Sequence, residues 1–105
     1  MHDVPEIDIH AAKEALDAGT ATFVDVRDPA SHAAAHIPGC RHIASQQDVD
    51  ALDDELDLAD AVIVYCYHGN ASKDATLFLK QKGFTNVHSM TGGFEAWRAA
   101  YAVEQ

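Results

Sequence analysis

The sequence has little cysteine, few basic residues and no long apolar run. Its two cysteines, Cys40 and Cys66, are too few for a disulfide framework, and neither belongs to a CxxC motif or a Cys/His spacing typical of zinc, so we expect no metal site. No stretch approaches the roughly 18 to 20 apolar residues that cross a bilayer. Residues 1–6 lack the basic-then-apolar order of an export signal, and we therefore expect a cytoplasmic protein that does not engage membranes.

Positive charge is also scarce. Seven Lys and Arg residues face 17 Asp and Glu residues, which gives a formal net charge of -10 with histidine neutral. The basic residues are spread singly along the chain, so the sequence argues against nucleic-acid binding. The same charge repels small anions at long range, and an anionic substrate would need a local electropositive pocket.

What the chain does have is enough apolar material for one core. It has 105 residues, of which 48% are hydrophobic. A chain of this length buries roughly 65% of the surface that its unfolded form exposes, which is adequate without disulfides. We therefore expect residues 1–105 to form a single domain.

Strand-like and helix-like patterns alternate along the sequence. Strand patterns occur at residues 7–9, 22–26, 40–44, 61–65 and 87–90. Helical patterns occur at residues 9–18, 29–37, 48–60, 71–82 and 94–101. This alternation predicts an α/β fold with a mostly parallel central sheet flanked by helices on both faces.

Several segments have a predicted place in that fold. The apolar run 61–65 is typical of a central parallel strand. The acidic segment 48–60 is interpreted as one helix with a solvated face rather than a partner-binding patch. The aromatic residues of the last two helical segments are expected in the core: Phe78, Phe94, Trp97 and Tyr101.

The loop after the predicted central strand is the best candidate for a site, because ligands of parallel sheets bind at the carboxyl ends of strands. Cys66 stands at that end. Gly69 and Asn70 are the residues best able to adopt the positive φ angles of a tight loop. Inward amides and the following helix N-terminus would then favour a nucleophilic thiolate. The alternative, a buried inert thiol, stays open at this point.

The remaining candidates belong to the same loop. The predicted site comprises Cys66 and the residues that follow it: Tyr67, His68, Gly69, Asn70, Ala71 and Ser72. His68 either contacts a substrate or points to water. Cys40 follows Pro38-Gly39 and is expected to be structural or incidental.

Four motifs resemble, in order and spacing, the rhodanese homology domain. They are residues 22–28 (TFVDVRD), residues 36–39 (HIPG), the strand that ends in Cys66, and residues 92–97 (GGFEAW). The resemblance covers nearly the whole chain, and the loop is most similar to that of the single-domain bacterial thiosulfate sulfurtransferases of this family.

The resemblance implies a catalytic cycle. Cys66 would attack the outer sulfur of thiosulfate, release sulfite and become a persulfide, and cyanide or a thiol acceptor such as thioredoxin would remove that sulfur. No cofactor is required. The match also implies that Asp25 and Arg27 are structural, and that His36 fixes the turn before Pro38. An oligomeric state is not indicated.

The loop departs from the family pattern at its end. Ala71 stands where these sulfurtransferases tend to have serine, and the arginine that many rhodaneses carry near the end of this loop is missing. Ser72 is a candidate for the hydroxyl, and Lys73 is the nearest cation in sequence. We therefore expect weak affinity for thiosulfate.

Two other functions share this architecture or this cysteine. A cysteine phosphatase or arsenate reductase needs arginine six residues after the nucleophile to clamp an oxyanion, and Ser72 stands there instead. A sulfur-relay or binding module would take persulfide sulfur from a protein partner, with segment 48–60 as a docking face. The second alternative stays open.

Overall fold

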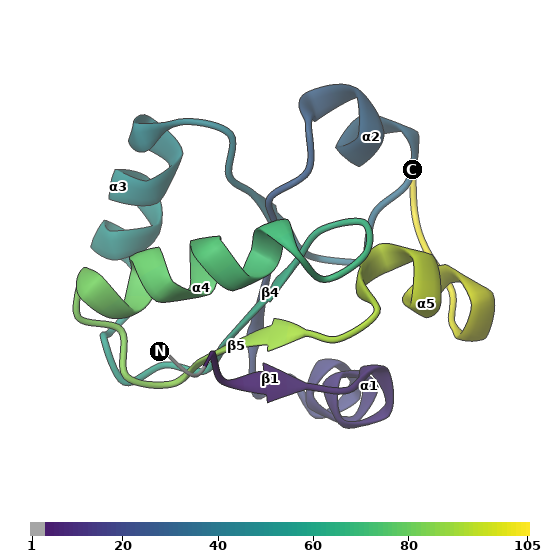
Figure 1. Cartoon of the computed structure of the whole chain (residues 1–105), viewed down its shortest axis with the longest axis horizontal. Coiled ribbons are helices and arrows are strands. Elements are labelled where there is room, and N and C mark those ends of the chain that lie inside the picture. The colour runs from purple at the N-terminus through teal and green to yellow at the C-terminus, as the bar shows by residue number, and fades with distance from the viewer. Residues whose placement is uncertain (1–3) are drawn as a thin grey trace.

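The computed structural model describes residues 4–105, and its five strands form one parallel sheet in the order β1-β5-β4-β2-β3 (Figure 1). The strands are β1 (Glu6–Ile7), β2 (Thr22–Asp25), β3 (Arg41–His42), β4 (Val62–Tyr65) and β5 (Val87–Met90). All four residues of β4 are buried, and this strand lies in the middle of the sheet. The predictions of a parallel sheet and of its central strand are confirmed.

Residues 4–105 form five helices, and four of them cover the two faces of the sheet. The five helices are α1 (Ile9–Ala18), α2 (Pro29–Ala34), α3 (Gln46–Glu55), α4 (Ala71–Gln81) and α5 (Gly93–Ala100). On one face α1 and α5 pack against Ile63 and Tyr65, and on the other α3 and α4 pack against Val62 and Val64 (Figure 1). None of the helices in residues 4–105 has the length and apolarity to cross a membrane.

Local sequence explains where three helices begin. The side chains of Asp8, Asp28 and Ser45 accept hydrogen bonds from the first-turn amides of α1, α2 and α3. Asp28 is followed by proline at the first helical position, as the sequence predicts. Gly19 ends α1 with a φ of 68°.

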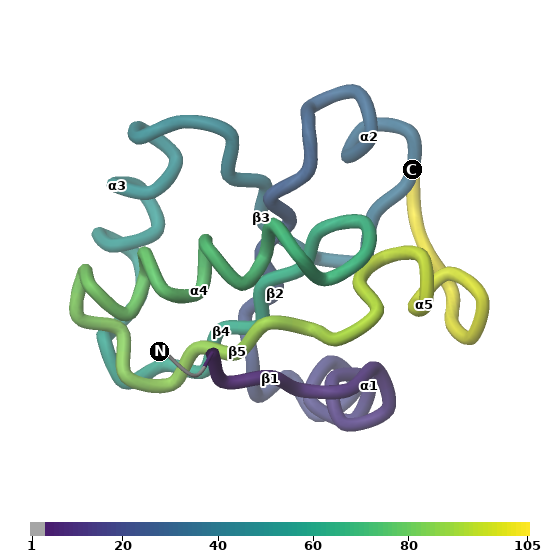
Figure 2. Tube along the Cα trace, in the orientation of Figure 1, coloured from purple at the N-terminus to yellow at the C-terminus, as the bar shows by residue number. Residues whose placement is uncertain are grey.

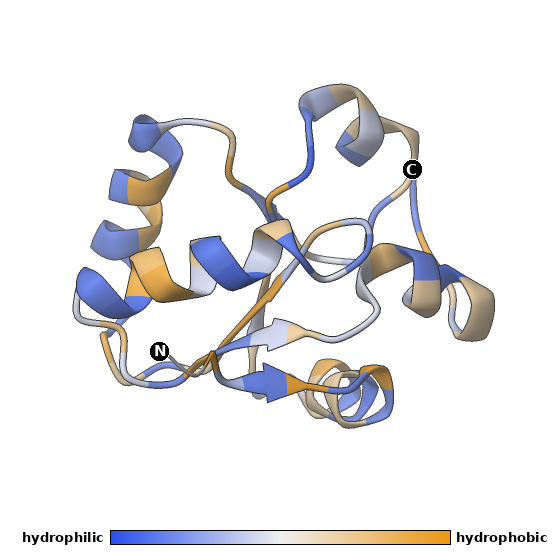
Figure 3. Ribbon diagram, viewed as in Figure 1, coloured by the Kyte–Doolittle hydropathy of each residue, from blue (hydrophilic) through white to orange (hydrophobic). Residues whose placement is uncertain are grey.

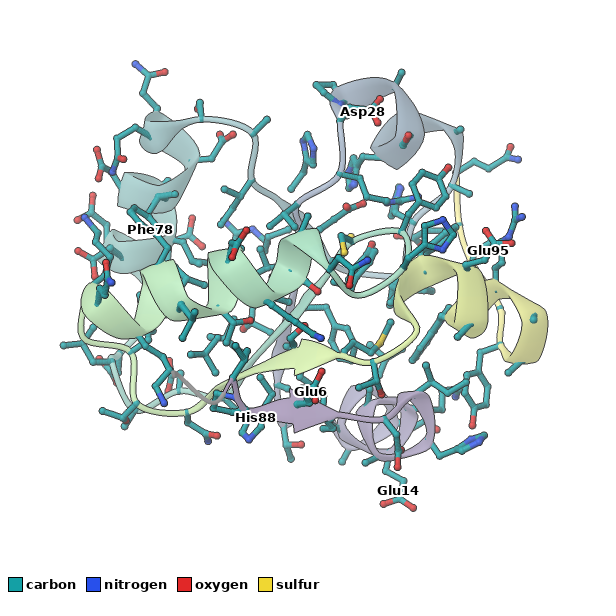
Figure 4. All side chains as sticks on the ribbon, viewed as in Figure 1. Glu6, Glu14, Asp28, Phe78, His88 and Glu95 are labelled. Atoms are coloured by element: carbon teal, nitrogen blue, oxygen red, sulfur yellow. The ribbon has the colours of Figure 1, made fainter. Side chains whose placement is uncertain are left out.

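One helix is shorter than predicted, and one prediction about a helical face is wrong. The acidic helix ends at Glu55, so residues 56–60 lie outside it, but its acidic face is exposed as expected, while Val49 and Leu52 are buried (Figure 3). Phe78 is 41% exposed (labelled in Figure 4), because α4 buries Ser72, Thr76 and Leu79 instead. The predicted burial of Phe94 and Trp97 is confirmed, and Tyr101 packs half-buried against them.

A buried ion pair closes the carboxyl end of β2. Asp25 is 0% exposed, and Arg27 donates to it from its amide (2.8 Å), its Nε (3.0 Å) and its Nη2 (2.8 Å). The Tyr65 hydroxyl donates to the same carboxylate at 3.2 Å, and His32 Nδ1 lies 3.0 Å from it. Burial by itself raises the pKa of Asp25, but the hydrogen bonds from Arg27 and His32 outweigh it and hold that pKa below its usual value.

His36 makes contacts beyond the predicted role at the turn before Pro38. Its Nδ1 donates to the carbonyl of His32 at 2.8 Å, and its backbone exchanges two hydrogen bonds with Glu104. The Glu104 carboxylate also accepts from the Gly39 amide at 3.1 Å. His36 therefore ties the C-terminal segment to residues 36–39 rather than shaping the turn alone.

Replacing Asp25 by Asn should destabilise the fold by about 3 kcal/mol, because it leaves the buried Arg27 charge without its partner. A carboxyl whose folded pKa is depressed stabilises the fold above its unfolded pKa of about 3.9, and this stabilisation is lost as the pH falls through the folded pKa. The stability difference between the proteins should therefore shrink on acidification below about pH 4. Urea unfolding at several pH values measures both effects. Lys13→Ala, which breaks an exposed pair with Asp17, is the matched control and should change little.

Candidate active site

Cys66 lies at the carboxyl end of the central strand, where the chain leaves β4 and turns into α4 (Figure 2). The residue is 6% exposed. The loop also passes beside the start of α5, so the cysteine sits between two helix N-termini (Figure 2). This is the position that the strand pattern predicts.

Hydrogen-bond donors converge on the cysteine sulfur. The amide of Gly69 donates to Sγ at 3.2 Å and the amide of Ser72 at 3.3 Å, and the Ser72 Oγ lies 3.5 Å from Sγ. Burial raises the pKa of the Cys66 thiol, but hydrogen bonds from Ser72, Gly69 and His68 outweigh it and bring that pKa below its ordinary value. The loop therefore favours a thiolate at Cys66.

The backbone of the loop differs from the predicted one at a single residue. Gly69 has a φ of 94°, as expected, whereas Asn70 has a φ of -91° and already adopts the right-handed conformation of the helix that follows. The Asn70 carbonyl accepts a hydrogen bond from the Lys73 amide, so this residue is the N-cap of α4 and has no need of a positive φ.

The N-terminus of α5 forms a second wall of the loop. The amide of Phe94 donates to the Cys66 carbonyl at 2.7 Å, and the amide of Glu95 donates to the Tyr67 carbonyl at 3.0 Å. Gly93 makes this approach possible, because a Cβ there would lie 2.5 Å from the Tyr67 carbonyl oxygen. The carbonyls of Cys66 and Tyr67 thus accept hydrogen bonds from α5, while the loop amides of Gly69 and Ser72 face the sulfur.

A pocket of about 210 Å³ opens beside the sulfur and is lined by Cys66, Tyr67, His68, Asn70 and Ala71. Tyr67 is 38% exposed, and the centroid of its ring lies 5.0 Å from the guanidinium carbon of Arg27. Among these lining residues there is neither Lys nor Arg. Lys73, the nearest cation in sequence, has its Nζ 3.6 Å from a Glu6 carboxylate oxygen.

Ser72 does not line this pocket, in contrast to the prediction that it offers a hydroxyl to the substrate. It is fully buried, and its Oγ lies 2.7 Å from the Oγ of Ser89 on β5. Sequence reasoning missed Ser89. The available sign was a serine within the predicted strand 87–90, where an apolar residue is the usual choice.

Cys40 belongs to a separate cluster with Asp25 and His32. One ligand atom from each of the three lies within 4.8 Å of the others, and the His32 ring stacks on those of His36 and His42. His32 and His36 are four residues apart in the sequence, an HxxxH spacing that points to this cluster. The Asp25 oxygen already accepts from Arg27, and an adjacent guanidinium opposes a metal cation, so these contacts describe a hydrogen-bond network.

The two thiols have opposite electrostatic settings. Burial raises the pKa of Cys40, and the nearby Asp25 carboxylate adds to this effect against the hydrogen bond that Tyr65 donates. Cys40 packs against the face of the sheet that α1 and α5 cover, whereas the Cys66 sulfur contacts the first turn of α4. Cys40 is therefore favoured as a neutral thiol outside the pocket.

Iodoacetamide at pH 7 should alkylate Cys66 well before Cys40, because the reagent reacts with the thiolate. Peptide mapping by mass spectrometry at short times measures the two rates separately. Cys66→Ser and Cys40→Ala assign each rate to its residue. Faster labelling of Cys40 in the folded protein would contradict the electrostatic description of both thiols.

Gly93→Ala should slow alkylation of Cys66 roughly tenfold or more, since the added methyl group displaces the loop carbonyls that α5 holds. Gly19→Ala is the matched control: Gly19 also has a positive φ, 68°, but nothing lies within 4 Å of its added Cβ. It should lose stability by about 1 kcal/mol and keep the Cys66 rate. Equal rates in both variants would mean that the contact between α5 and the loop does not shape the sulfur site.

Comparison with known proteins agrees with this geometry. Residues 8–100 match the model of the rhodanese-like domain. The chain is 45% identical over 84 residues to the thiosulfate sulfurtransferase GlpE of Pseudomonas paraeruginosa, covering 80% of this chain and 76% of that protein. It is 44% identical over 90 residues to GlpE of Pseudomonas entomophila, covering 86% and 82%.

A solved structure shares the fold. The solution structure of the rhodanese-like domain of the Anabaena protein Alr3790 superposes with a TM-score of 0.85 at 28% identity, covering 97% of this chain and 80% of that one. The family match extends over all five helices and over four of the five strands, all except β1. On this evidence the chain is a sulfurtransferase-type enzyme and belongs to the rhodanese-like domain family.

Proposed function

We propose that this chain is a thiosulfate sulfurtransferase that carries sulfane sulfur on Cys66. The observation that supports this most directly is the set of donors around the Cys66 sulfur, at 3.2 Å from Gly69 and 3.3 Å from Ser72. A sulfur held in this way is a nucleophile without a general base. The Pseudomonas relatives that are 44 and 45% identical to this chain are named thiosulfate sulfurtransferases.

The first half of the cycle is a displacement at sulfur. The Cys66 thiolate attacks the outer sulfur of thiosulfate, a new S–S bond forms, and the S–S bond of thiosulfate breaks with its electron pair leaving on sulfite. The terminal sulfur of the resulting persulfide lies in the pocket beside Tyr67 and Ala71. The loop amides and the N-terminus of α4 then stabilise its negative charge.

The second half returns the thiolate. Cyanide, or the thiolate of an acceptor, attacks the terminal sulfur, and the electron pair of the persulfide bond returns to Cys66. Thiocyanate or an acceptor persulfide leaves. A small thiol or a thioredoxin-like dithiol can reach the sulfur through the open side of the pocket, where Tyr67 is exposed. Neither half requires a cofactor.

The pocket fits sulfur transfer better than phosphoryl or arsenate chemistry. A cysteine phosphatase loop needs an arginine fork six residues after the nucleophile. Ser72 occupies this place, and its side chain is buried against Ser89 rather than directed into the pocket. Because the pocket lining offers no side-chain cation, we expect a high KM for thiosulfate.

Intact-mass spectrometry before and after excess thiosulfate, and again after cyanide, tests the cycle. The wild type should gain about one sulfur atom and lose it to cyanide as thiocyanate. Cys66→Ser should gain none, because a serine hydroxyl is a far weaker nucleophile at neutral pH. Cys40→Ala is the matched control and should behave as the wild type.

Other outcomes have defined meanings. Retained sulfur transfer in Cys66→Ser would overturn the assignment of the nucleophile. No gain from thiosulfate, with a gain from a protein persulfide donor, would instead support a sulfur-relay module.

A further inference from the structure

A chain of two buried hydroxyl groups ends at the Cys66 sulfur. The Ser89 Oγ lies 2.7 Å from the Ser72 Oγ, which in turn lies 3.5 Å from Sγ. Ser72 and Ser89 are both buried. Neither Ser72 nor Ser89 lines the pocket, so the two hydroxyls approach the sulfur from the protein interior and not from the pocket.

The register of the sheet fixes the place of Ser89. Ser89 of β5 pairs with Val64 of β4, two residues before Cys66. Side chains two residues apart along a strand lie on the same face, and Val64 and Val87 both belong to the apolar cluster under α3 and α4. Ser89 thus places a hydroxyl among valines, where burial costs free energy unless the hydroxyl is hydrogen-bonded.

The number of protons decides which of the two serines donates to the other. Each serine hydroxyl carries one proton, and a thiolate can only accept. If Ser89 donates to the Ser72 Oγ, the Ser72 proton is free to point at the sulfur, and each proton has an acceptor. If Ser72 donates to Ser89 instead, the sulfur loses that donor, and the Ser89 proton has no acceptor among residues 4–105.

We propose that Ser89 is a positioning residue for Cys66: its hydroxyl donates to Ser72 and so commits the Ser72 proton to the sulfur. Ser89 touches neither the substrate nor the sulfur in this arrangement. The inference rests on the proposed function only in taking Cys66 as the reacting sulfur. It explains why a strand of the core carries a serine behind the reactive loop.

Loss of the Ser89 hydroxyl should therefore raise the pKa of Cys66 without changing the residues that line the pocket. Ser72 would keep its amide hydrogen bond to Sγ, but its hydroxyl proton would no longer be directed there. A hydrogen bond to a charged group corresponds to about one unit in the pKa of the acceptor. At a pH well below the midpoint, the thiolate population should fall roughly tenfold.

The test compares Ser89→Val with Ser89→Thr, which have nearly the same shape and differ in the hydroxyl. The readout is the pH dependence of Cys66 alkylation by iodoacetamide, which needs no sulfur donor, followed by the pH profile of kcat/KM with thiosulfate. In Ser89→Val both midpoints should rise by about one pH unit, while Ser89→Thr should keep them near the wild-type value. Equal midpoints in the two variants would overturn the proposal.

Thr76→Val is the matched control for loss of a buried hydroxyl, since Thr76 donates to the Ser72 carbonyl at 2.7 Å and not to the chain that ends at the sulfur. It should leave the alkylation midpoint unchanged. If the larger side chains at position 89 prevent folding, Ser89→Ala is compared in wild-type and Ser72→Ala backgrounds. The Ser89→Ala shift should vanish when Ser72 has no hydroxyl, and an undiminished shift would contradict the proposal.

The outcome is separable from that of the proposed function. A Ser89→Val shift in alkylation together with no sulfur gain from thiosulfate would leave Ser89 assigned and overturn thiosulfate as donor. Sulfur transfer from thiosulfate with equal alkylation midpoints in the two Ser89 variants would support thiosulfate as the donor and overturn the role of Ser89.

Discussion

The buried ion pair between Asp25 and Arg27 is the interaction on which the segments around the reactive loop depend. Arg27 neutralises the carboxylate, and the Arg27 Nη2 also donates to the Ala35 carbonyl at 2.6 Å, which joins the end of β2 to the segment after α2. The guanidinium lies 4.0 Å from the centroid of Phe94 and 5.0 Å from that of Tyr67. One ion pair thus contacts β2, α5 and the loop. The Arg27 guanidinium is next to the rings of Phe94 and Tyr67, which lie beside the site, and it does not line the pocket itself.

The loop itself is organised by a division of its polar groups. Its carbonyls at Cys66 and Tyr67 accept from the first amides of α5, and the amides of Gly69 and Ser72 donate to the sulfur. Had the carbonyls lacked these partners, turning the amides inward would leave buried acceptors unsatisfied, at about 1 to 3 kcal/mol each. Gly93 is therefore as much a part of the sulfur site as Gly69, although it stands 27 residues from Cys66 in the sequence.

Sequence alone predicted the features that local patterns determine. The alternation of strands and helices, the central strand and the place of Cys66 follow from runs of a few residues. The wrong predictions for Phe78 and Ser72 have a common cause. Phe78 was expected in the core and Ser72 at the substrate, but α4 turns a different face to the sheet from the one its apolar residues predict, so Ser72 is buried and Phe78 is exposed. Which face a helix buries is set by its packing against the sheet. A serine within the predicted strand 87–90 was visible in the sequence, but its hydrogen-bond partner was not, since Ser72 belongs to another element.

The absence of a side-chain cation from the pocket lining gives backbone dipoles the main electrostatic role at the sulfur. Backbone amides are fixed in place and short in range, so they stabilise charge on the sulfur they surround more than they attract a free dianion from solution. The formal net charge of -10 opposes such an anion at long range. In the proposed cycle these amides would hold first a thiolate and then a persulfide, and binding of the sulfur donor would depend on the close contacts of the pocket. A neutral sulfur donor would meet no long-range repulsion and would benefit from the same amides once its sulfur is transferred.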